Sequence, residues 1–281
     1  MKCLLVGHLT VDIIAKGSTN ERRIGGGAYY SALALANFCE VEILTSVGRD
    51  FPGEWLDGLR ERGIKVKAIP SEKSTTYELR YSDGNTRTLR LLGRAEPITE
   101  VPHNRYDIVI LNPVANEIPP ETVEAFKERA DFLVADVQGF IRAPQIGEVK
   151  LISIDASFLK GIKVLHADIS EIPYLKSLQP KDVEVLLASN GPEPGRAYLR
   201  GEEYTYRPVE FDVEESTGAG DVFLASFSYF YKSCPFIQAL KRANAFTGLF
   251  LERRSFDFSM EEVGELARRV KVEKSEGVSQ H

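Results

Sequence analysis

Cysteine is scarce in this chain of 281 residues, and the three present, Cys3, Cys39 and Cys234, are far apart. This excludes a disulfide framework and a thiolate metal site, and it is typical of the reducing cytosol, so we expect a cytoplasmic location. No apolar run approaches the ~20 residues that span a bilayer, and the apolar stretch after Met1 is too short for a signal peptide. The four histidines are scattered without a His-Glu-x-x-His pattern, so a metalloenzyme is not indicated. We therefore expect neither a membrane partner nor a protein-built metal cage.

Excess positive charge is also missing. The chain has 35 Lys and Arg against 41 Asp and Glu, a formal net charge of −6, so the basic patch of a nucleic-acid-binding protein is not indicated. Hydrophobic residues make up 43% of the chain and charged residues 27%, which is ordinary for a globular protein. A chain of this length can bury a full core, and we expect residues 1–281 to form a single α/β domain.

Short apolar runs alternate with helical patterns over most of the chain. Such runs are typical of strands buried on both faces, and repeated β-then-α spacing predicts right-handed crossovers. The sequence therefore predicts a doubly wound α/β fold, with a mainly parallel central sheet flanked by helices. The expected strands are Lys2–Val6, Val41–Val47, Asp107–Leu111, Phe132–Val137, Ile162–Leu165 and Glu184–Ala188. The expected helices are Ala28–Phe38, Gly53–Arg62, Pro120–Ala130, a short one from Ile169, Gly218–Lys232, Phe236–Arg253 and Ser259–Val270, before a frayed tail from Glu273.

The stretch Ser71–Pro97 breaks this rhythm. Two alternating runs flank Asp83-Gly84-Asn85, which is a strong hairpin signal, and Val11–Lys16 also alternates. Since alternation means one wet face, we expect a small antiparallel flap outside the buried sheet, built from about residues 10–24 and 71–97. An exposed edge of this flap could pair with a second subunit, or its Lys and Arg residues could prevent pairing. A monomer and a flap-mediated homodimer therefore both stay open.

The most informative segment is Ser216–Asp221, which reads Ser-Thr-Gly-Ala-Gly-Asp and leads into an apolar helical pattern. Small residues at a helix start let backbone N–H groups approach an anion, and the helix dipole adds partial positive charge. Such a site would stabilise a transferring phosphoryl group, and Asp221 could accept the proton of an attacking hydroxyl. A plainer interpretation is that Thr217 caps the helix and Asp221 complements its dipole. The segment does not complete a dinucleotide fingerprint, and no Walker-type phosphate loop is present.

This segment closely resembles the Asp-Thr-Gly-Ala-Gly-Asp signature of the ribokinase-like (PfkB-type) carbohydrate kinases. Weaker resemblances follow in the family's order along nearly the whole chain. They are Gly7–Asp12 for the first strand and its substrate-gripping aspartate, Ile24–Gly27 for the di-glycine hinge, Val47–Asp50 for the Gly-x-Asp segment, Asp168–Glu171 for the Asn-x-x-Glu motif and Ser189–Gly191 for the Thr-x-Gly turn. The resemblance implies a ribokinase-like fold, in which the Ser71–Pro97 hairpin is the β-lid.

The resemblance also implies a role for each matching residue. Asp221 would be the catalytic base, and the N–H groups of Gly218, Ala219 and Gly220 would form the anion hole. The residues implied to bind the acceptor are Asp12, Thr10, Gly25, Gly26 and Tyr30. Those implied to bind the nucleotide are Ser189, Gly191, Thr217, Gly218, Gly220 and Asn244. Those implied to organise Mg²⁺, through water or phosphate, are Glu171 and Asp168. The implied activity is transfer of the γ-phosphoryl group of ATP, with Mg²⁺, to a hydroxyl of a small polyol or sugar.

Departures from the family pattern bear on the acceptor. Ser216 replaces the first Asp of the signature and can still cap the turn, whereas Asp168 replaces an Asn and adds charge near the metal. Thr10 and Tyr30 stand where ribokinases have asparagines, so simple ribokinase activity is not expected. The Tyr30 ring suits stacking on a flat cyclitol. The Gly-His-Leu-Thr-Val-Asp opening and the Gly-Gly-x-Ala-aromatic helix are also similar to inositol kinases of the family. We therefore expect myo-inositol as the acceptor.

Two alternatives stay open. One is a kinase of the same family that acts on a nucleoside or another sugar. The other is a non-catalytic sensor on the same fold that binds a nucleotide or a cyclitol, although retention of Asp221 behind an intact Gly-Ala-Gly argues against it.

Overall fold

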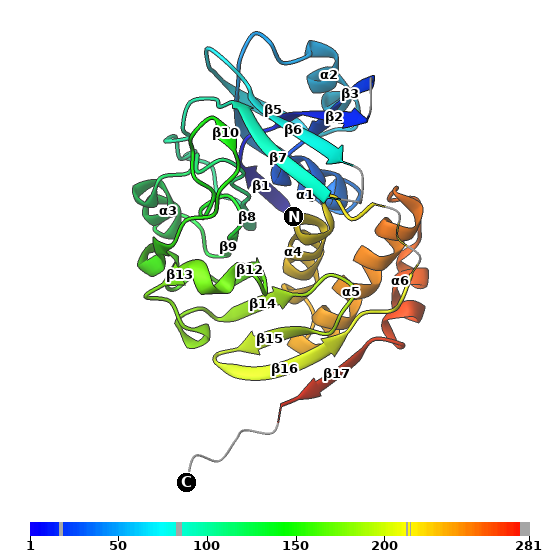
Figure 1. Ribbon diagram of the computed structural model, residues 1–281. Coiled ribbons are helices and arrows are strands. Elements are labelled where there is room, and N and C mark those ends of the chain that lie inside the picture. Colours follow the sequence, from blue (N-terminus) through cyan, green and yellow to red (C-terminus); the bar gives the residue numbers. More distant parts are fainter. Residues whose placement is uncertain (17–18, 83–85, 212, 214, 276–281) are drawn as a thin grey trace.

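The computed structural model describes the chain except residues 17–18, 83–85, 212, 214 and 276–281. A large twisted sheet runs through the molecule with helices on both of its faces, and a smaller sheet lies across one end of it (Figure 1). The predicted doubly wound α/β fold with a lid is confirmed.

The large sheet has ten strands in the order β17-β16-β15-β14-β12-β9-β8-β1-β4-β5. From β14 to β5 all neighbours are parallel, as the continuous apolar runs predict. The remaining strands extend this sheet in antiparallel fashion. The bounds are β1 Lys2–Val6, β4 Glu40–Val47, β5 Lys65–Pro70, β8 Ile108–Leu111, β9 Leu133–Asp136, β12 Val164–Asp168, β14 Val185–Ser189, β15 Gly195–Leu199, β16 Glu202–Arg207 and β17 Lys271–Lys274.

Alternate residues of β1 supply two hydrophobic cores, one on each face of the sheet. Cys3 and Leu5 pack with the core that contains α1, α4, α5 and α6, and Leu4 and Val6 pack with the core that contains α3. In the described part of the chain, no helix combines the length and the apolar character that crossing a membrane requires. The helices are α1 Gly27–Leu35, α2 Gly53–Glu61, α3 Pro120–Lys127, α4 Ala219–Tyr231, α5 Phe236–Arg253 and α6 Met260–Ala267, with 3-10 turns η1 Ala156–Leu159, η2 Ile172–Tyr174 and η3 Pro180–Asp182.

Two local expectations are wrong. The tail was expected to fray from Glu273, but Glu273 pairs with Thr205 of β16 and the strand continues to Lys274. The unpaired edge of β16 offers backbone hydrogen-bond partners, so this polar segment forms a strand although its sequence does not indicate one. The short helix expected from Ile169 is only the 3-10 turn η2. This turn ends at Tyr174 because the next residues form the strand β13 (Leu175–Lys176), which pairs with β11 (Ile154–Asp155).

The small sheet, which we call the lid, has the order β10-β7-β6-β2-β3. The predicted β6–β7 hairpin is present, and its expected turn at Asp83–Asn85 lies outside the described residues. The lid is mostly antiparallel, but β2 and β6 are parallel, and β10 joins from a later part of the chain. The bounds are β2 Thr10–Lys16, β3 Thr19–Gly25, β6 Thr75–Ser82, β7 Thr86–Gly93 and β10 Gly147–Glu148.

Buried hydrogen bonds attach the lid to the large sheet where β6 begins. The Thr75 hydroxyl lies 2.7 Å from His8 Nδ1, just after β1. The Ser74 backbone N–H and hydroxyl both donate to Asp50 Oδ1, at 2.9 and 2.8 Å, and the Gly48 N–H donates to the Ser74 hydroxyl. The Gly-x-Asp segment noted in the sequence therefore anchors the base of the lid.

Phe227 of α4 tests this core. Its side chain is fully buried and stacks on Tyr231 at 5.2 Å between ring centroids. We expect Phe227→Ala to lower the free energy of unfolding by about 3–5 kcal/mol, because the core cannot close over the lost ring. Ile237→Ala, at an exposed position of α5, should change it by less than about 0.5 kcal/mol. Urea denaturation measures both, and similar losses for the two variants would contradict this packing.

Candidate active site

Strand β3 ends in a glycine turn that lies between two carboxylates. A Cβ atom on Gly25 would lie 2.1 Å from Asp12 Oδ2, and one on Gly27 would lie 2.5 Å from Asp221 Oδ1. Gly26 has a φ of 98°, which favours glycine, and its Cβ would meet a backbone oxygen at 2.4 Å. Gly26 thus needs glycine, and a side chain at Gly25 or Gly27 would displace the neighbouring carboxylate. The turn therefore brings Asp12 of the lid close to Asp221 of α4.

Thr10 and Asp12 form one side of this site. The Thr10 hydroxyl donates to Asp12 Oδ1 at 2.7 Å, and Thr10 pairs with Gly25 across the β2–β3 ladder. The structure thus brings together Asp12, Thr10, Gly25 and Gly26, as expected for an acceptor site. The hydrogen bond from Thr10 fixes the orientation of the carboxylate.

Tyr30 differs from the expectation. A Cβ on Gly218 would lie 2.4 Å from Tyr30 Cγ, so the ring packs against the Gly218 backbone and does not offer that face to an acceptor. Burial and the nearby charge of Asp12 raise the pKa of the Tyr30 hydroxyl, which therefore stays protonated. Tyr30 therefore supports the loop before α4 with one face of its ring.

The start of α4 presents backbone amides. Gly218 is the N-cap, with a φ of 82° and no side chain capping the helix, so the plainer interpretation of Thr217 as the cap is wrong. The Ala219 N–H donates to the Ser216 carbonyl at 3.1 Å and is not available to a ligand, contrary to the expected three-amide anion hole. The N–H groups of Gly218 and Gly220 have no acceptor among the described residues. They can therefore bind an anion, assisted by the helix dipole.

Asp221 lies in the first turn of α4 beside these amides. Asn112 Nδ2, just after β8, donates to its Oδ1 at 3.3 Å, while the buried Oδ1 of Asn112 has no partner in the described part of the chain. Burial and the negative charge of Asp136 raise the pKa of Asp221 to about 7, although His166, Arg142 and the hydrogen bond from Asn112 act in the opposite direction. A carboxylate with a pKa near neutrality is an effective general base.

Sequence reasoning missed a histidine–aspartate pair beneath the amides. His166 of β12 and Asp136 of β9 are direct neighbours in the sheet, and Nδ1 of His166 forms a 2.5 Å hydrogen bond to Oδ2 of Asp136. The other ring nitrogen lies 3.1 Å from the Ser189 hydroxyl, and a Cβ on Gly220 would lie 2.8 Å from the ring. Burial opposes the charged imidazole, but Asp136 outweighs it and raises the pKa of His166. A polar residue near the carboxyl end of each strand was the available signal.

Glu171 and Asp168 lie at the end of β12. Glu171 accepts a hydrogen bond from the Asp168 N–H at 2.9 Å, and Asp168 Oδ1 is bound by the Ser170 backbone N–H and hydroxyl. Burial and the charge of Asp136 raise the pKa of Glu171 to about 7. Among the described residues no group of three acidic, His or Cys side chains could cage a metal. Mg²⁺ commonly takes one or two carboxylates together with water and phosphate, and Glu171 fits that mode.

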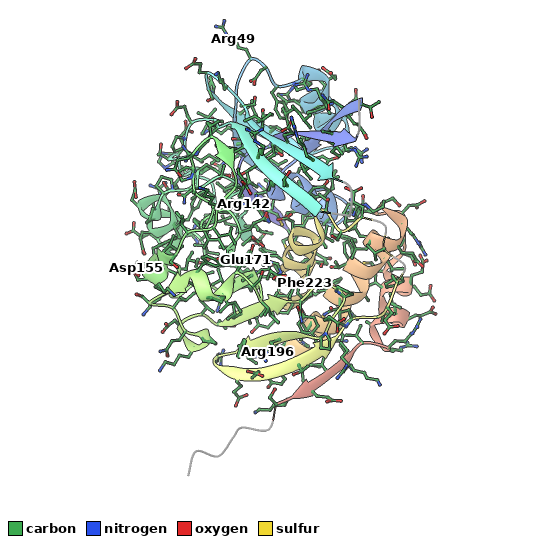
Figure 2. The ribbon with its side chains drawn as sticks, viewed as in Figure 1. Arg49, Arg142, Asp155, Glu171, Arg196 and Phe223 are labelled. Carbon is green, nitrogen blue, oxygen red and sulfur yellow. The ribbon has the colours of Figure 1, made fainter. Side chains whose placement is uncertain are left out.

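Arg142 was also missed. It follows β9 and lies between the lid and the region of Glu171 (Figure 2). Its guanidinium donates to the Val114 carbonyl at 3.2 Å and lies 5.5 Å from the ring centroid of Tyr77 on the lid. Its positive charge offsets part of the rise in the pKa values of Glu171 and Asp221. Arg142 thus places a cation beside an acidic cluster.

The predicted nucleotide residues are only partly brought together. Ser189 is joined to the helix start through His166, and Gly191, with a φ of 56°, lies just beyond β14 next to open space. Asn244 is buried in α5, where its Nδ2 donates to the Leu240 carbonyl at 2.8 Å. Its amide nitrogen is therefore used within its own helix.

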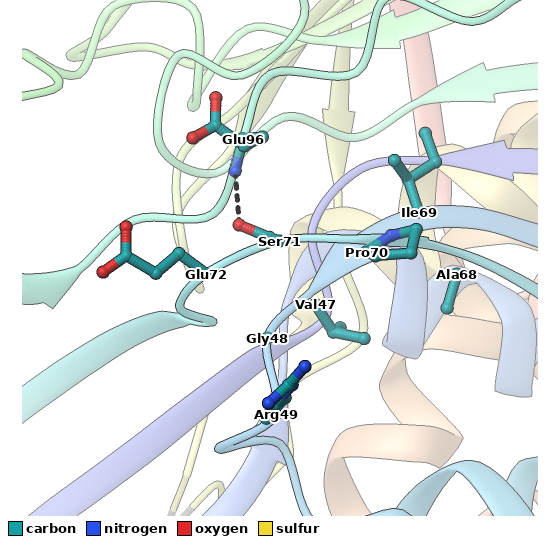
Figure 3. A pocket seen from close by; sticks show the side chains of 9 residues that line it. All are labelled: Val47, Gly48, Arg49, Ala68, Ile69, Pro70, Ser71, Glu72 and Glu96. Atoms are coloured by element: carbon teal, nitrogen blue, oxygen red, sulfur yellow. Dashed lines mark hydrogen bonds between the residues drawn. The ribbon is translucent and has the colours of Figure 1, made fainter.

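A hollow of about 680 Å³ lies elsewhere, at the carboxyl ends of β4 and β5 (Figure 3). None of its lining residues belongs to the predicted site. They are Val47, Gly48, Arg49, Ala68, Ile69, Pro70, Ser71, Glu72 and Glu96. The site is therefore identified by its chemistry and not by this hollow.

Fold and site together are typical of a ribokinase-like kinase. Residues 2–262 match the model of the pfkB family carbohydrate kinases, and the chain belongs to that family. Solved structures agree in fold. A pyrophosphate-dependent kinase in the ribokinase family, complexed with a pyrophosphate analog and myo-inositol, has a TM-score of 0.80 at 22% identity and covers 94% of this chain and 99% of its own. Ribokinase from Thermotoga maritima has a TM-score of 0.73 at 16% identity, and the match covers 95% of this chain and 99% of the ribokinase chain.

Curated relatives are plant enzymes. Inositol 3-kinase of Arabidopsis thaliana is 29% identical over 240 residues, which are 79% of this chain and 66% of the relative. Inositol 3-kinase of Oryza sativa subsp. japonica is 26% identical over 247 residues, which are 80% and 62%. The chain spans less than two thirds of the length of these relatives.

Asp221 is tested by its pH dependence. We expect Asp221→Asn to lower kcat by about 100- to 10,000-fold, because the amide cannot take a proton. In the wild type, kcat/KM should rise with pH through about 7 and level off above it, since the deprotonated carboxylate is the active form. Glu121→Gln, in the first turn of α3, should change neither value. A kcat of the Asp221 variant near that of the wild type would exclude the base role.

Proposed function

We propose that this carbohydrate kinase transfers the γ-phosphoryl group of Mg-ATP to a hydroxyl of myo-inositol. The observation that carries the proposal is the glycine turn that abuts Asp12 on one side and Asp221 on the other. A small polyol held by Asp12 would therefore present a hydroxyl to Asp221. The names of the plant relatives and the myo-inositol in a structural neighbour support the acceptor.

The acceptor would be held by hydrogen bonds. Asp12, oriented by the Thr10 hydroxyl, would accept from two hydroxyls of a polyol, and the protonated Tyr30 hydroxyl would donate. No arginine or lysine is among these residues, which suits an uncharged acceptor better than a phosphorylated one. The lid, anchored at Ser74 and Thr75, would exclude water that competes for the phosphoryl group.

Asp221 would take the proton of the attacking hydroxyl. The amide of Asn112 holds its carboxylate, and the raised pKa makes it a competent base near neutral pH. The N–H groups of Gly218 and Gly220 would bind the oxygens of the phosphoryl group, with the dipole of α4 and the imidazole of His166 behind them.

The remaining residues would balance charge. Mg²⁺, when bound with the donor, supplies positive charge against the phosphate oxygens, and Glu171 is the residue that would hold it through water. Arg142 adds a fixed cation on the lid side of the same acidic cluster. Asp168, tied to Ser170, would act on the metal only through its charge.

Pyrophosphate is a second candidate donor. Two structural neighbours with TM-scores of 0.80 are pyrophosphate-dependent kinases. In addition, the amide of Asn244, expected beside the adenine, is engaged by its own helix. The anion site at α4 can bind the terminal phosphate of either donor, so the choice depends on contacts to the adenosine.

A matrix of donors and acceptors tests the proposal. ATP and pyrophosphate, each with Mg²⁺, are paired with myo-inositol, ribose, fructose and a nucleoside, and the phosphorylated product is measured by chromatography. We expect the highest kcat/KM for myo-inositol with ATP. Turnover only with pyrophosphate would refute ATP as the donor in favour of pyrophosphate. Turnover of a nucleoside but not of myo-inositol would refute myo-inositol as the acceptor. Binding of ligands without turnover would support a sensor.

Asp12 is tested separately from catalysis. We expect Asp12→Asn to raise the KM for myo-inositol by about tenfold or more, because a charge-assisted hydrogen bond is lost, while the KM for the donor stays constant. Initial rates with each substrate varied in turn measure both constants. An unchanged acceptor KM would remove Asp12 from the acceptor site.

A further inference from the structure

The loop before α4 is held from the carboxyl end of α5. Nη1 of Arg254 donates to the Glu215 carbonyl at 3.1 Å and to the Thr217 carbonyl at 3.0 Å. Arg254 comes from the end of a different helix, more than thirty residues further along the chain. The loop conformation is therefore imposed by a tertiary contact.

The contact to Thr217 fixes the direction of the next amide. In a trans peptide the C=O of one residue and the N–H of the next point in opposite directions, and no cis peptide occurs in the described chain. With the Thr217 carbonyl bound to Arg254, the Gly218 N–H must point away from the guanidinium. That N–H has no acceptor among the described residues. Arg254 therefore holds a donor ready for an external anion.

Aromatic rings complete the support. The Arg254 guanidinium lies 4.7 Å from the ring centroid of Phe250, and Phe250 meets Tyr30 edge-to-face at 6.3 Å. Tyr30 in turn packs against Gly218. The loop is thus enclosed by a chain of contacts through Tyr30, Phe250 and Arg254. Rotation of the Thr217–Gly218 peptide would break the hydrogen bond from Arg254 to the Thr217 carbonyl.

The backbone of Arg254 is unusual. It follows the last residue of α5 with a φ of 50°, in the left-handed region that helices commonly end in with glycine. Its N–H donates to the Phe250 carbonyl at 2.7 Å. Glycine relieves the strain of such a position and a cation is favoured near a helix C-terminus, but neither explains the two hydrogen bonds that the Arg254 side chain makes with the loop.

We propose that Arg254 is a positioning residue for phosphoryl transfer, which acts by holding the Thr217–Gly218 peptide so that the Gly218 N–H faces the transferred phosphoryl group. The proposal rests on the proposed function, because it assigns the Gly218 amide to the anion site. Within the described residues, the guanidinium of Arg254 donates to two carbonyl groups of the loop and lies over the ring of Phe250.

The chain contains a matched control. Arg200, in the turn between β15 and β16, also has a left-handed backbone, with a φ of 51°. Arg254→Gly and Arg200→Gly both remove a guanidinium and both relieve the left-handed backbone. Only the first should affect catalysis. We expect Arg254→Gly to lower kcat by about 10- to 100-fold, with the KM for the acceptor unchanged, and Arg200→Gly to stay within about twofold of the wild type.

Two measurements separate positioning from a structural role. The melting temperature of Arg254→Gly should lie within about 3 °C of that of Arg200→Gly, since both variants relieve a left-handed backbone and the hydrogen bonds lost with Arg254 are exposed. Millimolar guanidinium, or the variant Arg254→Lys, should restore part of the lost kcat. A kcat loss below twofold, a loss that comes with a lower melting temperature, or a loss that neither treatment restores would overturn the proposal. So would a raised donor KM at constant kcat, which would indicate direct contact with the donor.

The wild type separates this proposal from the proposed function. If wild-type protein shows no phosphoryl transfer in the donor and acceptor matrix, the proposed function fails. If the wild type is active and Arg254→Gly matches Arg200→Gly, only the role of Arg254 fails.

Discussion

The close approach of backbone to two carboxylates at Gly25–Gly27 is the constraint on which the site depends. The turn ends the lid strand β3 and begins α1, so it joins the lid to the main layer of helices. Because a Cβ atom at Gly25 or Gly27 would displace a carboxylate, and one at Gly26 would meet backbone, Asp12 on the lid and Asp221 on α4 can both contact the same short segment. The turn thereby sets the position of the two carboxylates relative to each other.

An excess of negative charge is the second feature of the site. Burial and the charge of Asp136 raise the pKa values of both Glu171 and Asp221 to about 7. His166 and Arg142 offset only part of this charge. Such a cluster is costly for folding, since ionised carboxylates are poorly solvated there. Under the proposed function it would supply a base at neutral pH and favour the arrival of a divalent cation with the donor.

The lid and the loop before α4 are held in place by different kinds of contact. A buried hydrogen bond between Thr75 and His8 and a partly buried one from Ser74 to Asp50 fix the base of the lid to the sheet. The loop before α4 depends on Arg254 and on packing by Tyr30. Arg23 of β3 also reaches Glu215 of this loop at 3.3 Å. Both side chains are well exposed, so this ion pair contributes little to stability, but it shows that lid and loop meet directly.

The parallel sheet, the β6–β7 hairpin and the glycine-rich start of α4 were readable from the sequence, because period, turn residues and glycine placement are local properties. Membership of the family followed from Gly218–Asp221 and its order relative to the other motifs. The strand at Glu273, the occupied amide of Ala219 and the packing of Tyr30 on Gly218 were not readable. The hydrogen bond between His166 and Asp136 and the hydrogen bonds from Arg254 to the loop were not readable from the sequence either. Each of these depends on which strands become neighbours or on where a distant helix ends. The order of strands in the sheet and the positions of helix ends bring together residues that are far apart in the chain. A local sequence pattern does not show which distant residue will be the contact partner.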